Sequence, residues 1–261
     1  MLKVPVMLID VEESKEMTEL LDLALAAHGG LERWREVAQL QVKAKVDGST
    51  WASDGVLART VATIETRAQR LTFEPFGAPD RSSNFAPDRV EILNADGSVY
   101  AEREAPRSSF APNSAWDQLH KAYFAGYALW NYMSTPFLFA GDGFQVDEID
   151  PWQENGETWR RLRVQFPDHI ATHSPVQVFY FDAEDHLLRR QDYNVDVLGD
   201  NYPAAHYKTD HRTFGGLTFP TRHRVVPRNP DNTSRPGPII VAIDIESVST
   251  STSTSATVGS S

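Results

Sequence analysis

Alternation of apolar and polar side chains, repeated in one segment after another, is the feature that most restricts how this chain folds. Successive side chains of a β-strand point to opposite faces, so a period of two predicts a strand with one buried face. Residues 40–46 show this period, and turn residues between paired runs predict hairpins at 89–104 and 176–198. The remaining predicted strand regions are 59–76, 158–166 and 239–248.

The first strand of the second hairpin is apolar on both faces. Val176, Val178 and Tyr180 share one face, and Phe179 and Phe181 lie on the other. A sheet that is covered on one side only does not need two apolar faces, whereas a strongly curved sheet with helices against its concave side does. We therefore expect a strongly curved, mostly antiparallel sheet that encloses a cavity unless side chains fill it.

Two segments have a helical period instead. An N-terminal helix is predicted between Ser14, as its N-cap, and a stop at Gly29–Gly30, with a short helical turn after it. A central helix is predicted over 114–137, with Ser114 as its cap and Pro136 as its stop. Because strands precede and follow this helix, the order of elements predicts an α+β fold.

The domain organisation predicted from this order is simple. Residues 1–248 form a single domain, because neither a repeat nor a Pro/Gly linker divides them. Residues 249–261 are uncharged, rich in serine and threonine and without a core-forming pattern, which predicts a disordered tail.

The central helix carries an unusual number of aromatic side chains. Aromatic residues at helical spacing usually pack in a core, yet tryptophan and tyrosine also suit the wall of a ligand site, because each combines an apolar body with a polar tip. Both roles are compatible if the helix lies over the concave face of a curved sheet. The candidate ligand-binding residues are Trp116, Tyr123, Tyr127, Trp130 and Met133.

Charge and composition exclude several classes of function. The formal net charge of -11 argues against binding to nucleic acid or to an anionic lipid surface. The chain has no cysteine, which excludes disulfides, thiolate catalysis and cysteine-bound zinc. It has no dinucleotide- or phosphate-binding motif, so we expect no cofactor. The apolar run at residues 4–9 is too short for a signal peptide, and we therefore expect a cytoplasmic protein.

The segment LALAAHGGLERWREVAQLQVKAKV, at residues 23–46, resembles the opening of bacterial lipoprotein carriers of the LolA/LolB-like superfamily. The likeness in organisation extends over most of residues 15–248. It implies an open, strongly bent antiparallel half-barrel, in which helices plug the concave face and leave a cavity that accepts acyl chains. What the resemblance implies for this chain is therefore a half-barrel fold and a hydrophobic pocket.

Histidines are concentrated in YPAAHYKTDHRTFGGLTFPTRH, residues 202–223. In a regular strand His206 and His211 point to opposite faces, and Lys208 shares the face of His206, where an ammonium group would oppose a cation. The sequence therefore predicts no metal site. A second group, HIATH at 169–173, lacks the glutamate of a zinc-helix motif and is interpreted as an exposed loop between two strands.

The same histidines are candidates for acid/base chemistry. If the second strand of the 176–198 hairpin folds back symmetrically onto the segment 202–223, Asp196 lies opposite His206. The two side chains then form a carboxylate–imidazole pair. That face, which also carries Asp192, is either exposed to solvent or lines the cavity, because a slip of one residue exchanges the two faces. The opposite face is less charged and would place His211 and Tyr193 in the cavity as its polar groups.

Three functions remain open. The first is binding of a lipid or another hydrophobic small molecule in the cavity of the half-barrel. The second is a cofactor-independent isomerase, cyclase or hydrolase that acts on a hydrophobic substrate, with His206 and Asp196, or His211 and Tyr193, as catalytic residues. The third is a protein-interaction role for the predicted loops at 77–88 and 226–238.

Overall fold

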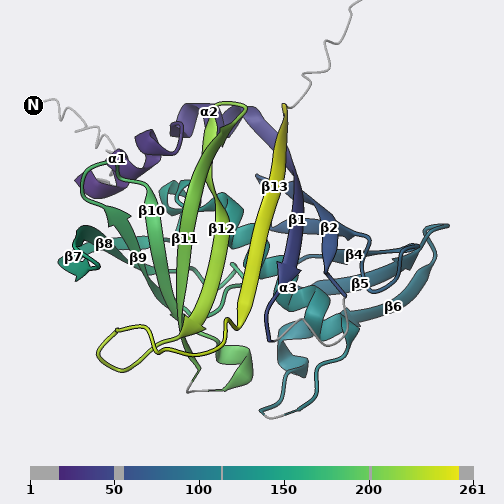
Figure 1. The fold of residues 1–261 in the computed structure, drawn as a ribbon. Helices are drawn as coiled ribbons and strands as arrows, with labels where there is room; N and C mark the ends of the chain where they lie inside the picture. The colour runs from purple at the N-terminus through teal and green to yellow at the C-terminus, as the bar shows by residue number, and fades with distance from the viewer. Residues whose placement is uncertain (1–17, 50–55, 113, 200–201, 253–261) are drawn as a thin grey trace, which may run out of the picture.

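A computed structural model describes residues 18–49, 56–112, 114–199 and 202–252, and these form one open antiparallel sheet with a few helices (Figure 1). The strands are β1 (Val37–Asp47), β2 (Arg59–Glu65), β3 (Arg70–Glu74), β4 (Arg81–Phe85), β5 (Arg89–Asn94), β6 (Val99–Glu104), β7 (Gln145–Glu154), β8 (Glu157–Gln165), β9 (Val176–Asp182), β10 (Leu188–Asn194), β11 (Pro203–Phe214), β12 (Leu217–Pro227) and β13 (Val241–Thr252). The helices are α1 (Glu19–Ala27), α2 (Leu31–Glu36) and α3 (Gln118–Ser134), with short 3-10 turns η1 (Pro106–Ser109), η2 (Phe137–Ala140) and η3 (Asp196–Leu198).

The strand order makes the sheet a half-barrel rather than a closed barrel. It runs β6-β5-β4-β3-β2-β1-β13-β12-β11-β10-β9-β8-β7, with β6 and β7 at the two edges. One meander, β1 to β6, therefore lies on one side of the centre, and a second, β7 to β12, lies on the other. The two meanders join where β13 pairs with β1. The predicted α+β fold with an open, curved antiparallel sheet is confirmed.

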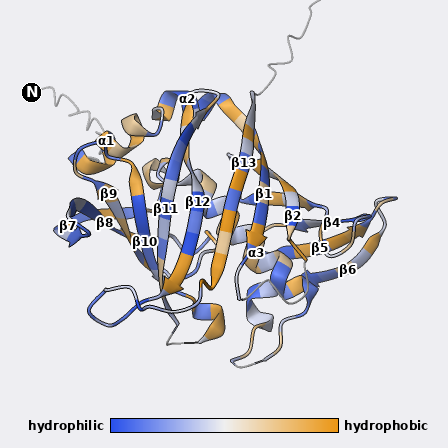
Figure 2. Cartoon of the chain, viewed as in Figure 1, coloured by the Kyte–Doolittle hydropathy of each residue, from blue (hydrophilic) through white to orange (hydrophobic). Residues whose placement is uncertain are grey.

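The central strand β1 shows why the sheet forms. Leu40, Val42 and Ala44 are buried, whereas Lys43 and Lys45 between and after them are exposed, so the alternation predicted for this strand is confirmed. Figure 2 shows hydrophobic and hydrophilic residues alternating along β1 and its neighbour β13. One face of the sheet is therefore apolar by sequence, and this face turns toward α3.

Helix α1 is shorter than predicted at its start and ends as predicted. Its N-cap is Thr18, whose hydroxyl accepts a hydrogen bond from the backbone N–H of Leu21, and not Ser14, which lies outside the described residues. After Ala27 the chain leaves the helix through Gly29 and Gly30, whose φ angles of 111° and 88° favour glycine. The short α2 follows, as the sequence predicts.

Helix α3 also begins later than predicted. Its N-cap is Asp117, which accepts a hydrogen bond of 2.9 Å from the backbone N–H of His120, while the His120 ring accepts one from the Asp117 N–H. This reciprocal capping box, with a histidine in the usual place of glutamate, replaces the predicted cap at Ser114. The helix ends before Pro136, as expected. Among the described residues, no helix has both the length and the apolar character that crossing a bilayer requires.

Three parts of the sheet differ from the sequence-based expectations. Strand β4 occupies part of the predicted 77–88 loop, and the edge strand β7 was not predicted, because most of its residues are exposed or half-buried on both faces and show no alternation. Residues 249–252, predicted to belong to a disordered tail, extend β13 and pair with the first half of β1. The rest of the predicted tail, 253–261, lies outside the described residues.

A glycine sets the distance between α3 and the sheet. Helix α3 packs against β3, β4 and β5, and a Cβ atom on Gly126 would lie 2.4 Å from Cγ of Phe85 on β4. Both residues are buried, so Phe85 has little freedom to move away. The close approach of helix and strand therefore requires glycine at this position.

We expect Gly126→Ala to lower the free energy of unfolding by about 1–3 kcal/mol, because overpacking outweighs the better helix propensity of alanine. The matched control is Gly237→Ala, since nothing lies within 4 Å of the Cβ position there and the backbone is not left-handed. That variant should stay within about 0.5 kcal/mol of the parent. Urea denaturation measures both values, and equal stability of all three proteins would contradict this packing.

Candidate functional site

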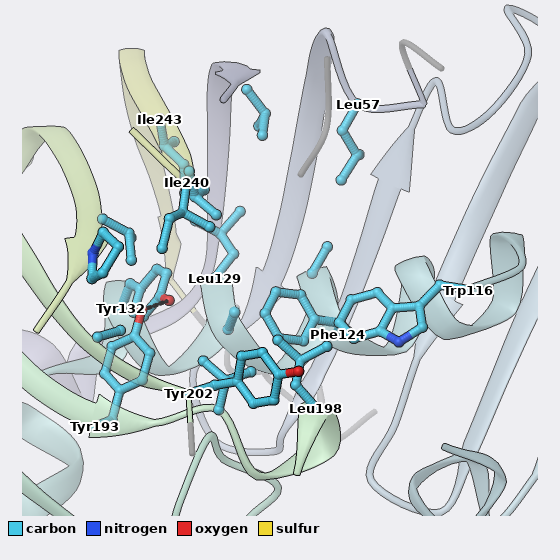
Figure 3. Close-up of a pocket in the computed structure, with 18 of the residues that line it drawn as sticks. Leu57, Trp116, Phe124, Leu129, Tyr132, Tyr193, Leu198, Tyr202, Ile240 and Ile243 are labelled. Carbon is cyan, nitrogen blue, oxygen red and sulfur yellow. Dashed lines mark hydrogen bonds between the residues drawn. The ribbon is translucent and has the colours of Figure 1, made fainter. Parts of the chain in front are cut away.

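A cavity of about 570 Å³ lies between α3 and the concave face of the sheet (Figure 3). Its volume is within the range of small-molecule sites in proteins. The wall from α3 is a single helical stripe, formed by Phe124, Ala125, Ala128, Leu129 and Tyr132. The facing wall comes from the middle of the sheet and includes Ala44, Thr60, Phe73, Ala204, Val225 and Ile243.

The two ends of the cavity differ in exposure. Its mouth is marked by lining residues that are exposed to solvent, Ser114, Tyr202 and Arg235. Arg235 is the single charged residue that lines the cavity in the described part of the chain. At the inner end lie Tyr132 and Tyr193, which are only 4% and 3% exposed. Figure 3 shows these two rings side by side, far from Trp116 at the other end of the view.

The inner end is backed by a chain of hydrogen bonds, here called the tyrosine–histidine relay. The hydroxyls of Tyr193 and Tyr132 are 3.1 Å apart, and the Tyr132 hydroxyl lies 2.7 Å from Nε2 of His173. The other ring nitrogen of His173 is 3.3 Å from the hydroxyl of Tyr127. The rings of His173 and Tyr193 also stack, with their centroids 4.1 Å apart.

Burial keeps the relay uncharged. Desolvation, aided by the positive charge of Arg107, lowers the pKa of His173 to about 3. Desolvation also raises the pKa of the Tyr127 and Tyr132 hydroxyls well above 10, and that of Tyr193 in the same direction. Neither an imidazolium nor a phenolate therefore forms in this network near neutral pH.

A buried histidine pair lies beside the relay. His223 Nε2 is 3.0 Å from the backbone oxygen of Pro220, which only accepts, so this nitrogen carries the hydrogen. Nδ1 of a neutral His223 must then accept from His206 Nε2, at 3.0 Å. His206 Nδ1 is left as a bare nitrogen, and no hydrogen-bond partner for it is found among the described residues. Desolvation lowers the pKa of both rings well below 6.5, which favours these neutral forms.

Lys208 is the second group in this region without a partner. Its side chain is fully buried, and within the described ranges its amine makes no hydrogen bond. The amine lies 4.4 Å from the centre of the Tyr132 ring, a position that would suit a cation over an aromatic face. Desolvation nevertheless lowers the pKa of Lys208 well below 10.5. Burial without a counter-charge outweighs one ring contact, so the neutral amine is favoured.

The predicted pair of His206 and Asp196 does not form, which corrects the sequence-based register. Strand β10 ends at Asn194, and Asp196 lies in the 3-10 turn η3, where it accepts a hydrogen bond from the Asn194 side chain. In the sheet His206 pairs with Gln191 and Tyr193 pairs with Ala204. The shift from the predicted register is an odd number of residues, which moves His206 onto the face of Tyr193.

Asp192 therefore lies on the opposite face of the sheet from His206. There its carboxylate accepts two hydrogen bonds from the Arg190 guanidinium, at 2.7 and 2.8 Å, and one from the Tyr180 hydroxyl at 2.7 Å. This ion pair is buried on the side of the sheet that faces away from the cavity.

His211 and Tyr193 are not brought together either. Asp210 has a left-handed φ of 56°, which interrupts the alternation of β11 just before His211. The His211 ring then approaches His28 at the end of α1, with 6.4 Å between the ring centroids, and one of its nitrogens lies 3.0 Å from the backbone oxygen of Leu188. Desolvation lowers the pKa of His28 and of His211 to about 4.

Of the five predicted ligand-binding residues, Trp116 lines the cavity and the other four do not. Tyr123 packs against Phe85, Tyr127 belongs to the relay, and Met133 is buried in the core. Trp130 donates hydrogen bonds to the backbone oxygens of Glu65 and Ala68 on the sheet side. The cavity faces the neighbouring stripe, which the small side chains of Ala125 and Ala128 could have indicated.

Sequence reasoning also missed His173. The loop predicted at 169–173 is confirmed, and His169 is exposed, but His173 is only 1% exposed and lies at the centre of the relay. A buried histidine in a loop gives no periodic signal, so its position depends entirely on tertiary packing. Within the described ranges, no group of three or more histidine, aspartate or glutamate side chains is placed to hold a metal ion.

The open antiparallel half-barrel with a helix across its concave face defines the architectural class, which is the LolA-like fold. A LolA superfamily protein from Nitrosomonas europaea aligns with 87% of this chain and 91% of its own length, at 10% identity and a TM-score of 0.50. A domain from Vibrio parahaemolyticus named for outer membrane lipoprotein sorting aligns with 90% and 92%, at 9% identity and a TM-score of 0.53. At these identities the likeness extends to the fold alone. No protein-family model and no curated protein matches the sequence.

We expect Lys208→Met to raise the free energy of unfolding at pH 7 by about 1–3 kcal/mol, the cost of burying a polar group without a partner. Below pH 10.5 the unfolded chain protonates this lysine while the folded chain resists protonation, so the parent loses stability as pH falls toward the lowered folded pKa. The difference in the free energy of unfolding between Lys208→Met and the parent should therefore shrink by up to about 1.4 kcal/mol per pH unit as pH rises toward 10.5.

Guanidinium denaturation at pH 7 and pH 9 measures this difference. Lys43→Met is the control, because Lys43 is exposed on β1, and it should change stability by less than about 0.5 kcal/mol at either pH. A Lys208→Met protein that is less stable than the parent at pH 7 would contradict the assignment of Lys208 as an unpaired buried amine.

Proposed function

We propose that the protein binds a lipid or another hydrophobic small molecule in the cavity beneath α3. The observation that carries this proposal is the cavity itself, about 570 Å³ of space with mostly apolar walls and an exposed mouth. Transfer of apolar surface from water into such a site is favourable by roughly 25 cal/mol per Å². A ligand with an extended apolar body gains most from these walls.

The polar groups of the lining support selection of an amphiphilic ligand rather than a polar one. They are few: Ser114, Tyr202 and Arg235 at the mouth, Thr60 in the wall of the sheet, and the hydroxyls of Tyr132 and Tyr193 at the inner end. Apart from Thr60, the wall between these ends offers hydrocarbon and aromatic surface. Such a distribution, with a few convergent polar groups in an apolar pocket, is typical of small-molecule sites.

The fold is consistent with this proposal. The Vibrio parahaemolyticus domain with the same architecture is named for outer membrane lipoprotein sorting. For this chain we propose the coarser role, a container for a hydrophobic molecule, in a cytoplasmic protein as the sequence predicts. The enzymatic alternative needs His206 beside Asp196, or His211 beside Tyr193. The structure brings neither of these together, so binding is the better supported function.

Fluorescence titration with the neutral probe N-phenyl-1-naphthylamine tests the proposal. The parent protein should bind the probe and release it when a long-chain alkane is added. Ala128→Phe places a ring in the cavity and should weaken probe binding at least about tenfold, because the ligand and the new side chain compete for the same volume. Ala125→Phe on the same stripe is the second blocking variant.

The matched control is Ala26→Phe, which adds the same ring at an exposed position of α1 and should leave binding unchanged. Circular dichroism in the near and far ultraviolet establishes that each variant is folded. If the folded blocking variants bind the probe as well as the parent does, or if the parent does not bind it, the proposed function is wrong.

A further inference from the structure

We infer that the inner end of the cavity is a head-group site, at which the hydroxyls of Tyr132 and Tyr193 hydrogen-bond an uncharged oxygen of the ligand, such as that of a ketone, ester or alcohol. This inference rests on the proposed function and deepens it, because it assigns the class and the orientation of the ligand. The apolar chain of the ligand then extends from the inner end along the α3 stripe toward the mouth.

Counting hydrogens in the tyrosine–histidine relay leads to this site. Each of its three tyrosines supplies one O–H, and the neutral His173 supplies one N–H, but only three contacts link the four groups. Each contact uses a single hydrogen. One hydrogen of the relay therefore always has no acceptor inside the relay, whichever way the bonds point.

The position of this spare hydrogen depends on the tautomer of His173. When Nδ1 carries the hydrogen and donates to Tyr127, the tyrosines of the inner end donate toward His173, and the spare hydrogen is on Tyr127. When Nε2 carries the hydrogen and donates to Tyr132, the spare O–H moves to Tyr132 or Tyr193. Both of these line the cavity, whereas Tyr127 and His173 do not. A ligand oxygen at the inner end is the acceptor that this second state lacks.

The same relay can also accept a hydrogen bond. In the first state the Tyr193 hydroxyl donates to Tyr132 and keeps its own lone pairs free toward the cavity. An alcohol on the ligand could then donate to Tyr193. A ketone or an ester, which can only accept, would select the state in which Nε2 of His173 carries the hydrogen. Reversal of a hydrogen-bonded chain by a change of histidine tautomer requires no net charge, which suits a fully buried network.

The charges around the cavity select against a carboxylate at the inner end. Lys208, whose amine lies 4.4 Å from the centre of the Tyr132 ring, is favoured in its neutral form and does not line the cavity. A carboxylate there would lose its hydration without gaining a cation. Arg235 offers the cation at the mouth instead, so anionic amphiphiles should bind in the reverse orientation and gain nothing from the two tyrosines.

Displacement of N-phenyl-1-naphthylamine by dodecane and by 2-dodecanone tests the head-group site. The two ligands share the chain and differ in one carbonyl, so the ratio of their affinities reports the head group. We expect the ketone to bind about three- to tenfold more tightly than the alkane, as one net hydrogen bond provides. In Tyr193→Phe and in Tyr132→Phe the ratio should fall below about twofold.

Tyr100→Phe is the matched control, because Tyr100 is exposed on β6, and it should keep the ratio of the parent. An affinity ratio near one in the parent, or a ratio that survives in folded Tyr193→Phe, would overturn the head-group site while the cavity still binds alkane. If neither ligand displaces the probe because nothing enters the cavity, the proposed function fails as well. The two failures are therefore distinguishable.

Discussion

The passage of α3 across the concave face is the constraint on which the rest of the structure depends. The chain enters the sheet at its centre with β1, reaches one edge at β6 and resumes at the other edge with β7. The connection between the edges must therefore cross the whole half-barrel, and a helix of 17 residues, about 25 Å long, provides most of it. The side chains of this helix fill most of the space under the sheet, and the cavity remains where its stripe carries Ala125 and Ala128.

Polar groups without partners gather on the strands next to the inner end of the cavity. Lys208, the bare nitrogen of His206 and the amide oxygen of Gln191 are all buried, and no hydrogen bond to them is found in the described part of the chain. Each such group costs about 1–3 kcal/mol in folding. They lie on β10 and β11, on the face that also carries Tyr193. They are three of the eight buried polar side-chain atoms without a hydrogen-bond partner in the described part of the chain, and together they make the strands beside this pocket costly in folding free energy.

The sequence allowed the architecture to be predicted because periodicity is local. The alternation in β1, the stop at Gly29–Gly30 and the hairpin at 89–104 each depend on side chains within a few residues, and the structure confirms them. Apolar residues on both faces of β9 indicated the curvature of the sheet for the same reason.

The site was harder to predict because it depends on register and on packing between distant segments. The pairing of β10 with β11 is shifted from the symmetric register that we predicted, and this shift places His206 on the other face of the sheet. The alternation within each strand cannot specify the register between two strands. Helix α3 is buried on nearly all sides, so its apolar pattern does not indicate which stripe faces the cavity. His173 comes from a loop without any period, and only tertiary structure brings it to Tyr132.

The most direct test of the central claim is nuclear magnetic resonance of protein with labelled isoleucine and leucine methyl groups, in the presence of an apolar ligand. The account predicts intermolecular nuclear Overhauser effects from ligand protons to the methyls of Leu129 on α3 and Ile243 on β13, which both line the cavity, and none to Ile92, which is buried in the core outside it. Contacts confined to other methyl groups, or a ligand that leaves Leu129 and Ile243 unperturbed at saturation, would contradict it.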